Sequence, residues 1–343
     1  MSNLESDIKK VLEAIQESQW NFKPDFDYLS NYKIMTREDL RKVKMDKGYF
    51  KCTTSGSTGE SVSVEKTYTD LVWYAATNIR EFIWRKWDTS KNYAIIRPDS
   101  KVIDINNWGL PRSIFPNQGK VFKINYAPIS KIQTWLEEKN PNYIHCLPSI
   151  FKQLDLSKVT NFIDHKGTGE VGGSMFSSEE CGTIAITCPD NPSVYHVMEN
   201  HIVEVDSDGG MIITTMTNPY IKRYKNGDCI ELGTCNCGRT LQTIKKINGR
   251  IRNMFVLPNG DKKWPLIGSR DYYDKFGIKK YKAIQLSINE LELQIISEPL
   301  KDKEKDLIKL IQQWLESDIN VTIKYVDSFP NYKFEEFVSN VKI

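Results

Sequence analysis

The order of strand-like and helix-like segments restricts the fold of this sequence more than any other feature. From about residue 50 to residue 250, short β-like runs such as Tyr93–Ile96 and Tyr143–Leu147 alternate with helical ones such as Ile129–Lys139. Strands that alternate with helical segments favour an α/β architecture over an all-β one. The sequence therefore predicts a large, multi-layer α/β body.

The C-terminal part of the chain follows a different pattern. Ala283–Ser287 and Glu290–Ile296 alternate polar and apolar residues, as half-buried strands do. An amphipathic helix around Leu307–Leu315 follows, and residues 319–325 alternate again. This β-β-α-β order predicts a small α+β lid domain. We expect a body over residues 1–250 and a lid over 251–343, in line with domains of roughly 100–200 residues.

Composition excludes several classes of protein. Of 343 residues, 40% are hydrophobic and 11% aromatic, which excludes disorder and allows a sizeable core. A net charge of +3 gives no reason to expect nucleic acid as a partner. Seven cysteines are too few for a disulfide scaffold, and their odd number favours a reducing compartment over a secreted protein. With no apolar run near the roughly 18 residues of a membrane span and no signal-like start, we expect a cytoplasmic protein without a membrane span.

A cluster of small residues marks one candidate site. Residues 53–61 read Thr-Thr-Ser-Gly-Ser-Thr-Gly-Glu-Ser. Glycines let backbone amides crowd inward and hydroxyls add donors, so such a loop can wrap a polyphosphate. The loop lacks the Gly-Lys-Ser/Thr ending of a P-loop, which disfavours a P-loop NTPase. By itself, the same composition also fits a surface loop.

Four further stretches of the sequence, together with this loop, form an ordered set of motifs. They are Phe-Ser-Ser-Glu-Glu-Cys-Gly (176–182), Pro-Tyr-Ile-Lys-Arg-Tyr-Lys-Asn-Gly-Asp (219–228), Cys-Asn-Cys-Gly-Arg (235–239) and Gly-Arg-Ile-Arg-Asn (249–253). Together with the small-residue loop, and in this order, they resemble the motifs of the adenylate-forming superfamily. The phenylacetate–CoA ligase and capsule-type branch is the most similar. The resemblance covers nearly the whole chain and implies the adenylate-forming fold.

The resemblance implies an enzyme that uses ATP and Mg²⁺. A small carboxylic acid would attack the α-phosphate of ATP and release pyrophosphate, and the acyl group of the resulting acyl-adenylate would pass to an acceptor. The acceptor would be CoA, a carrier-protein thiol, or an amine such as a sugar amino group in polysaccharide or secondary-metabolite assembly. The β- and γ-phosphates would lie in the small-residue loop, at Thr54, Ser55, Gly56, Ser57, Thr58 and Gly59.

The other motifs assign further roles by resemblance. Glu180 takes the place of the Mg²⁺-binding glutamate, and its neighbour Glu179 is the alternative. Phe176 would present an aromatic face to adenine. Asp228 would accept hydrogen bonds from the ribose hydroxyls, and Arg250 would help hold the nucleotide at the hinge between the domains.

A lysine near the C-terminus completes the expected catalytic set. Lys333, preceded by Tyr332 where the family has glycine, would contact the carboxylate and the α-phosphate. A lysine charge suits the negative charge that develops on the phosphate. A solvated surface lysine is the alternative. The expected catalytic residues are therefore Lys333, Glu180 and Thr58.

Three cysteines and a histidine form a candidate metal site. Cys188 precedes His196 by eight positions, and the Cys-x-Cys of Cys235 and Cys237 follows about forty residues later. Three thiolates and an imidazole complete a closed tetrahedral Zn²⁺ shell, which is a structural one. Relatives in the phenylacetate–CoA ligase branch carry the same positions, so the resemblance implies zinc. A β-hairpin over Met198–Ile213 would bring the ligands together; four unrelated side chains are the alternative.

Departures from the family pattern keep other functions open. The chain is short at its N-terminus and just before Glu180, and Arg252 and Asn253 replace the hinge acids. These changes motivate a non-catalytic binding or scaffold protein as the alternative function. A protein that acylates its own cysteine would need one near the lid, and no cysteine follows Cys237. The sequence does not identify the acid, the acyl acceptor, the pathway or the oligomeric state.

Overall fold

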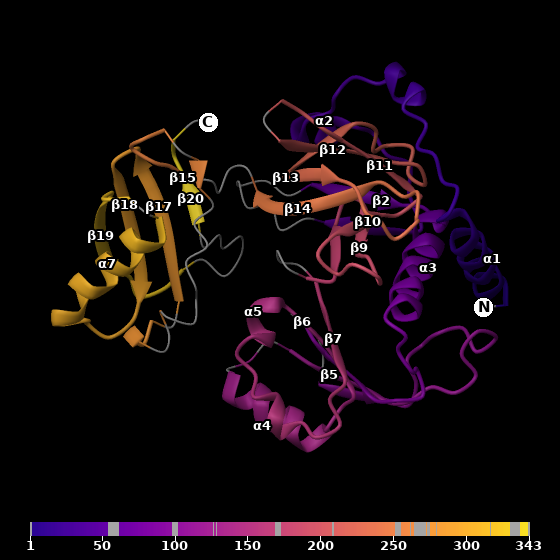
Figure 1. The fold of residues 1–343 in the computed structure, drawn as a ribbon, viewed down its shortest axis with the longest axis horizontal. Coiled ribbons are helices and arrows are strands. Elements are labelled where there is room, and N and C mark those ends of the chain that lie inside the picture. The colour runs from indigo at the N-terminus through magenta and orange to yellow at the C-terminus, as the bar shows by residue number, and fades with distance from the viewer. Residues whose placement is uncertain are drawn as a thin grey trace. The chain divides into compact units, whose positions relative to one another are not determined.

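The structure is a computed structural model, and its contacts divide the chain into two compact units (Figure 1). One unit comprises Met1–Thr54, Ser63–Asn226 and Ile230–Ile247, and the other consists mainly of Asn248–Ile343. The structure describes residues 2–53, 62–97, 102–125, 127, 129–168, 173–207, 209–250, 255–260, 262–263, 272, 275–278, 280–315, 317–329 and 337–341. No helix within these ranges is long and apolar enough to cross a membrane.

A five-stranded sheet of order β4-β5-β3-β6-β7 forms one layer of the first unit. β3, β5, β6 and β7 are parallel, whereas the edge strand β4 runs antiparallel to β5. Helices α4 and α5 lie beside this sheet in Figure 1, and Ile132 and Leu136 of α4 belong to the same core as Ile96 and Ile144. Its elements are β3 (Tyr93–Ile96), β4 (Ile103–Ile105), β5 (Val121–Ile124), α4 (Ile129–Lys139), β6 (Tyr143–Cys146), α5 (Pro148–Phe151), η2 (Leu156–Lys158) and β7 (Asp164–Gly167).

A seven-stranded sheet of order β11-β12-β13-β14-β10-β9-β8 carries both candidate sites. The β11–β12 hairpin is antiparallel, which confirms the hairpin expected within Met198–Ile213. The antiparallel hairpin β1–β2 forms a separate two-stranded sheet. The strands are β1 (Phe50–Thr53), β2 (Ser63–Lys66), β8 (Met175–Ser178), β9 (Gly182–Thr187), β10 (Tyr195–Val197), β11 (His201–Val205), β12 (Gly210–Thr215), β13 (Tyr224–Gly233) and β14 (Thr243–Arg250).

The N-terminal segment forms two helices and a short turn. Residues 2–18 form α1 (Ser2–Ser18), whose apolar side packs against α3 (Tyr68–Trp84) in one core. A short turn, η1 (Asp27–Asn31), follows. Thr36 caps α2 (Arg37–Lys42), with the Asp39 side chain completing a capping box, as Ser/Thr and an acid three residues later favour.

The second unit contains a four-stranded sheet of order β19-β18-β17-β20 and the amphipathic helix α7. Leu307, Ile311 and Leu315 of α7 share a buried core with strand residues such as Leu293. Figure 1 shows α7 beside the strands of this sheet. The β-β-α-β order predicted from the sequence is confirmed here. The elements are β15 (Phe255–Val256), β16 (Lys262–Lys263), β17 (Lys280–Ser287), β18 (Glu290–Ile296), η4 (Lys301–Lys303), α7 (Glu304–Leu315), β19 (Asn320–Tyr325) and β20 (Phe337–Ser339).

Candidate functional site

The β1–β2 hairpin flanks the expected phosphate loop. Residues 54–59, which carry the expected phosphate ligands, lie outside the described residues. The strands on either side are antiparallel, with Thr53 opposite Ser63 and Cys52 opposite Val64. The hydroxyls of Thr53 and Ser63 lie 2.9 Å apart, in hydrogen-bond contact. Thr53 and Ser63, the described residues nearest this segment on the two strands, are therefore held together by strand pairing.

The expected Mg²⁺ turn lies beside this hairpin. Glu179 and Glu180 occupy the turn between β8 and β9. The buried Lys66 of β2 donates a hydrogen bond of 2.5 Å from Nζ to the backbone carbonyl of Glu180. The pKa of the Cys52 thiol on β1 is raised mainly by burial and also by the nearby Glu179 carboxylate. The hairpin strand β2 is thus joined by a hydrogen bond to the turn that carries the two candidate Mg²⁺ ligands.

Glu180 is a buried carboxylate with defined partners. Its Oε1 accepts a hydrogen bond of 3.2 Å from the Tyr224 hydroxyl and lies 3.8 Å from a terminal guanidinium nitrogen of Arg37. Burial, and after it the Glu180 charge, raises the pKa of Tyr224, so this hydroxyl stays a donor. Sequence reasoning identified Glu180 but missed the roles of Lys66 and Arg37. Tyr224 lies in the motif of residues 219–228, and this was the only sequence feature that pointed to a residue beside Glu180.

The other expected nucleotide residues are described in part. Phe176 lies on β8 and is half-buried, and Asp228 lies on β13 just after Gly227, whose positive φ of 87° suits glycine. Arg250 is the last residue of β14, and its side chain lies outside the description, as does all of Lys333. Their assigned contacts with nucleotide and substrate remain predictions.

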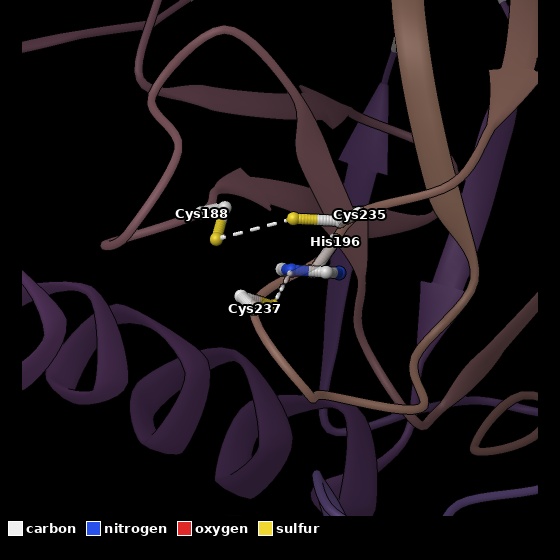
Figure 2. Close-up of side chains that lie close together, drawn as sticks. All are labelled: Cys188, His196, Cys235 and Cys237. Carbon is white, nitrogen blue, oxygen red and sulfur yellow. Dashed lines mark hydrogen bonds between the residues drawn. The ribbon is translucent and has the colours of Figure 1, made fainter.

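The structure gathers the four candidate zinc ligands (Figure 2). Cys188 follows β9, His196 lies on β10, and Cys235 and Cys237 lie in the turn between β13 and β14. Their ligand atoms all lie within 4.8 Å of one another. The His196 Nε2 is 3.2 Å from the Cys237 sulfur, and the Cys235 and Cys188 sulfurs are 3.7 Å apart. The four side chains therefore converge on a single point.

The electrostatics of this cluster suit a metal ion. Burial, with Arg239 and Arg80 nearby, lowers the pKa of His196 to about 4, so the imidazole is neutral at pH 7, as a metal ligand must be. Burial opposes ionisation of Cys237, but hydrogen bonds from the Arg239 backbone and side chain prevail and lower its pKa. Burial raises the pKa of Cys188 to about 12. A buried thiol of this kind becomes a thiolate when a cation takes the place of its proton.

Arg239 joins the cysteine cluster to its surroundings. Its guanidinium stacks between Trp20, 4.8 Å from the ring centroid, and Trp84, at 5.1 Å, and it pairs with Asp190 at 2.5 Å. Its Nε donates to the Gln19 side chain just after α1. The donor set is Cys₃His, closed and half-buried to buried, which fits a structural zinc site. The sequence also favours buried thiols at the remaining cysteines. This is confirmed for Cys146, Cys181 and Cys229 and is wrong for Cys52, which is half-buried on the short hairpin strand β1.

Comparison with known proteins rests on structure alone. No protein-family model matches the sequence, and no curated protein matches it. Among solved structures, 2-hydroxyisobutyryl-CoA ligase in its postadenylation state with 2-HIB-AMP superposes with a TM-score of 0.65 and 15% identity. That match covers 98% of this chain and 88% of the ligase.

Two further acyl-CoA ligases share the fold. The o-succinylbenzoate CoA synthetase of Bacillus subtilis, bound to its acyl-adenylate, matches at a TM-score of 0.55 and 11% identity over 84% of this chain and 68% of its own. The anthranilate CoA ligase bound to anthranoyl-AMP matches at a TM-score of 0.54 and 14% identity. That match covers 82% of this chain and 63% of the ligase. The chain therefore has a mixed α/β fold that resembles adenylate-forming acyl-CoA ligases over most of its length.

Proposed function

We propose that this protein activates a small carboxylic acid with ATP. The carboxylate attacks the α-phosphate, pyrophosphate leaves, and an acyl-adenylate forms. The acyl group then passes to CoA, to another thiol or to an amine, and the alternative is a non-catalytic member of the same fold.

One observation carries this proposal. Lys66, on the strand that follows residues 54–59, donates to the backbone carbonyl of Glu180, and the Glu179 carboxylate is near enough to raise the pKa of Cys52 on the strand that precedes them. Binding of a nucleotide with Mg²⁺ requires hydroxyls and amides for the polyphosphate and a carboxylate for the metal, and the sequence of residues 54–59 and the β8–β9 turn supply these groups. The presence of acyl-adenylates in the ligases that share the fold supports the same reading.

The residues would divide the work as follows. Thr58 and its neighbours would bind the β- and γ-phosphates, and Glu180 would hold Mg²⁺, which neutralises charge on the phosphates when bound. Asp228 would accept hydrogen bonds from the ribose. Lys333, in a C-terminal lid of residues 251–343, would place its ammonium at the carboxylate and α-phosphate. The phenylacetate–CoA ligase branch is the one we propose.

We also propose a structural Zn²⁺ at the cysteine cluster. Cys188, His196, Cys235 and Cys237 supply a closed Cys₃His set with no place for a substrate. The ion would join the end of β9, β10 and the β13–β14 turn. Elemental analysis of protein purified without chelators should give about one zinc per chain, and well under one equivalent would reject the site.

The deciding experiment is ATP–pyrophosphate exchange. The protein is tested against a panel of small aryl, fatty and amino acids, with Glu180→Gln as the matched inactive variant. We expect exchange with at least one acid and its loss in the variant. A folded protein that binds no nucleotide and exchanges with no acid would favour the non-catalytic alternative.

A further inference from the structure

The carboxylate of Glu180 is fixed by side chains from separate elements. Tyr224 belongs to β13 and Arg37 to α2, while Lys66 of β2 donates to the backbone carbonyl of the same residue. Glu180, Tyr224 and Lys66 are buried, and the Arg37 side chain is only 20% exposed. The buried carboxylate therefore has a guanidinium and a hydroxyl donor beside it, and such partners offset the cost of burying a charged group.

Backbone hydrogen bonds of the N-terminal segment place Arg37 next to Glu180. The amide of Met35 donates to the carbonyl of Arg223, and the amide of Lys225 donates back to the carbonyl of Met35, both at 2.9 Å. This short parallel bridge aligns the N-terminal segment with the start of β13. The capping box of Thr36 then begins α2 at Arg37, which points to Glu180.

The contacts of the carboxylate are one-sided. Tyr224 and Arg37 both approach Oε1, whereas within the described part of the chain no hydrogen bond or ion pair is made to Oε2. We propose that Arg37 is a positioning residue that, together with Tyr224, holds Oε1 and so presents Oε2 to a divalent cation bound with ATP. This inference rests on the proposed function, because it assigns Glu180 to the cation. Groups that orient a metal ligand typically change metal affinity when they are removed.

The test measures cation binding directly. Mn²⁺ is titrated into the full-length protein with a non-hydrolysable α,β-methylene ATP analogue, and its binding is followed by electron paramagnetic resonance and water-proton relaxation. We expect Arg37→Gln to weaken Mn²⁺ binding about tenfold or more. Arg37→Lys keeps the charge and should recover part of this loss. In exchange assays, the Mg²⁺ concentration for half-maximal rate should rise more than the rate at saturating Mg²⁺ falls.

The control comes from the same helix. Lys42 pairs with Glu38 on the exposed side of α2, so Lys42→Gln should bind Mn²⁺ as the wild type does. If Arg37→Gln does not fold, Tyr224→Phe carries the test, since it removes only the other donor to Oε1 and should also weaken binding. Unchanged or tighter Mn²⁺ binding in folded Arg37→Gln would overturn the inference.

The Glu180→Gln variant separates this inference from the proposed function. Weak Mn²⁺ binding in Glu180→Gln with wild-type binding in Arg37→Gln rejects only the role of Arg37. If Glu180→Gln also binds Mn²⁺ like the wild type, the assignment of Glu180 to the cation is itself wrong. A wild type that binds Mn²⁺ with the analogue but exchanges with no acid rejects the reaction and leaves the binding result to judge Arg37.

Discussion

At the scale of single residues, Lys333 gives the sharpest test of the adenylation step. We expect Lys333→Ala to abolish ATP–pyrophosphate exchange, because the charge that develops on the α-phosphate loses its cation. Hydrolysis of supplied acyl-adenylate should be largely intact, since that reaction does not pass through the same phosphate transfer. Both reactions are followed on one preparation of the variant. Equal loss in the two assays would remove Lys333 from its assigned role.

A second residue, His201, should make the protein sensitive to acid. Burial lowers its pKa to about 4, against 6.5 for an ordinary imidazole. Below pH 6.5 the unfolded chain binds a proton there that the folded chain does not, so stability falls as the pH drops toward 4. The full loss from this group is about 3 kcal/mol.

Replacing the imidazole isolates this contribution. His201 Nε2 lies 3.1 Å from the Cys181 carbonyl, and the amide of His201→Gln can reach the same oxygen without titrating. Urea unfolding between pH 7 and 4.5 should show a flatter dependence for the variant than for the wild type. Parallel curves for the two proteins would show that His201 does not contribute.

Sequence patterns identify a functional residue when the residues next to it in the sequence form a known motif. The cysteine cluster could be predicted because Cys235 and Cys237 stand in a short motif and Cys188 lies eight positions before His196, and Glu180 was singled out by its motif. Arg37 and Lys66 could not, because they stand in an ordinary helix and strand, and only the folding of distant segments brings them to Glu180. Lys66 and Glu180 are 114 positions apart, a distance over which local pattern carries no information.

At the scale of elements, a buried ion pair holds α1 to the body. Arg80 of α3 donates two hydrogen bonds, of 2.7 and 2.9 Å, to the Glu199 carboxylate, and both side chains are buried. Arg80 also donates to the carbonyl of Ile15, and the hydroxyl of Ser18 donates to Glu199. The end of α1 is therefore fixed by the same pair.

Removing one partner of this pair should be costly. Arg80→Ala leaves a buried carboxylate without its cation, for which we expect a loss of about 3–5 kcal/mol in urea unfolding. The double variant Arg80→Met/Glu199→Leu should recover much of it, since an apolar pair of similar volume carries no unpaired charge. Lys9→Ala, in an exposed pair with Glu13, is the control and should change stability by less than about 0.5 kcal/mol. A double variant as unstable as the single one would contradict this account.

Elements with strong periodicity could be read from the sequence, and short ones could not. Helices α1 and α7 and strands β17 and β18 follow apolar patterns that repeat over several turns or pairs. The seven-stranded sheet was not predicted as a unit, because β10 has three residues, all buried, and gives no alternation. Its strand order, with β14 between β13 and β10, is set by long-range pairing.

At the scale of the whole molecule, the two compact units should respond differently to metal removal. Each has its own hydrophobic core, so calorimetry should resolve two unfolding transitions. All four proposed zinc ligands belong to the first unit. The binding free energy of a structural zinc contributes to the stability of the unit that binds it.

Chelation should therefore lower one transition and leave the other in place. A loss of 1 kcal/mol lowers the midpoint by about 2–4 °C in a domain of this size, so we expect a shift of roughly 10 °C or more. Added Zn²⁺ should restore the wild type, whereas Cys188→Ser should unfold early with or without chelator. A closed Cys₃His shell stabilises only the strands and turns that supply its ligands. A single unfolding transition, or an equal shift of both transitions, would therefore contradict two separately folding units with zinc bound in only one of them.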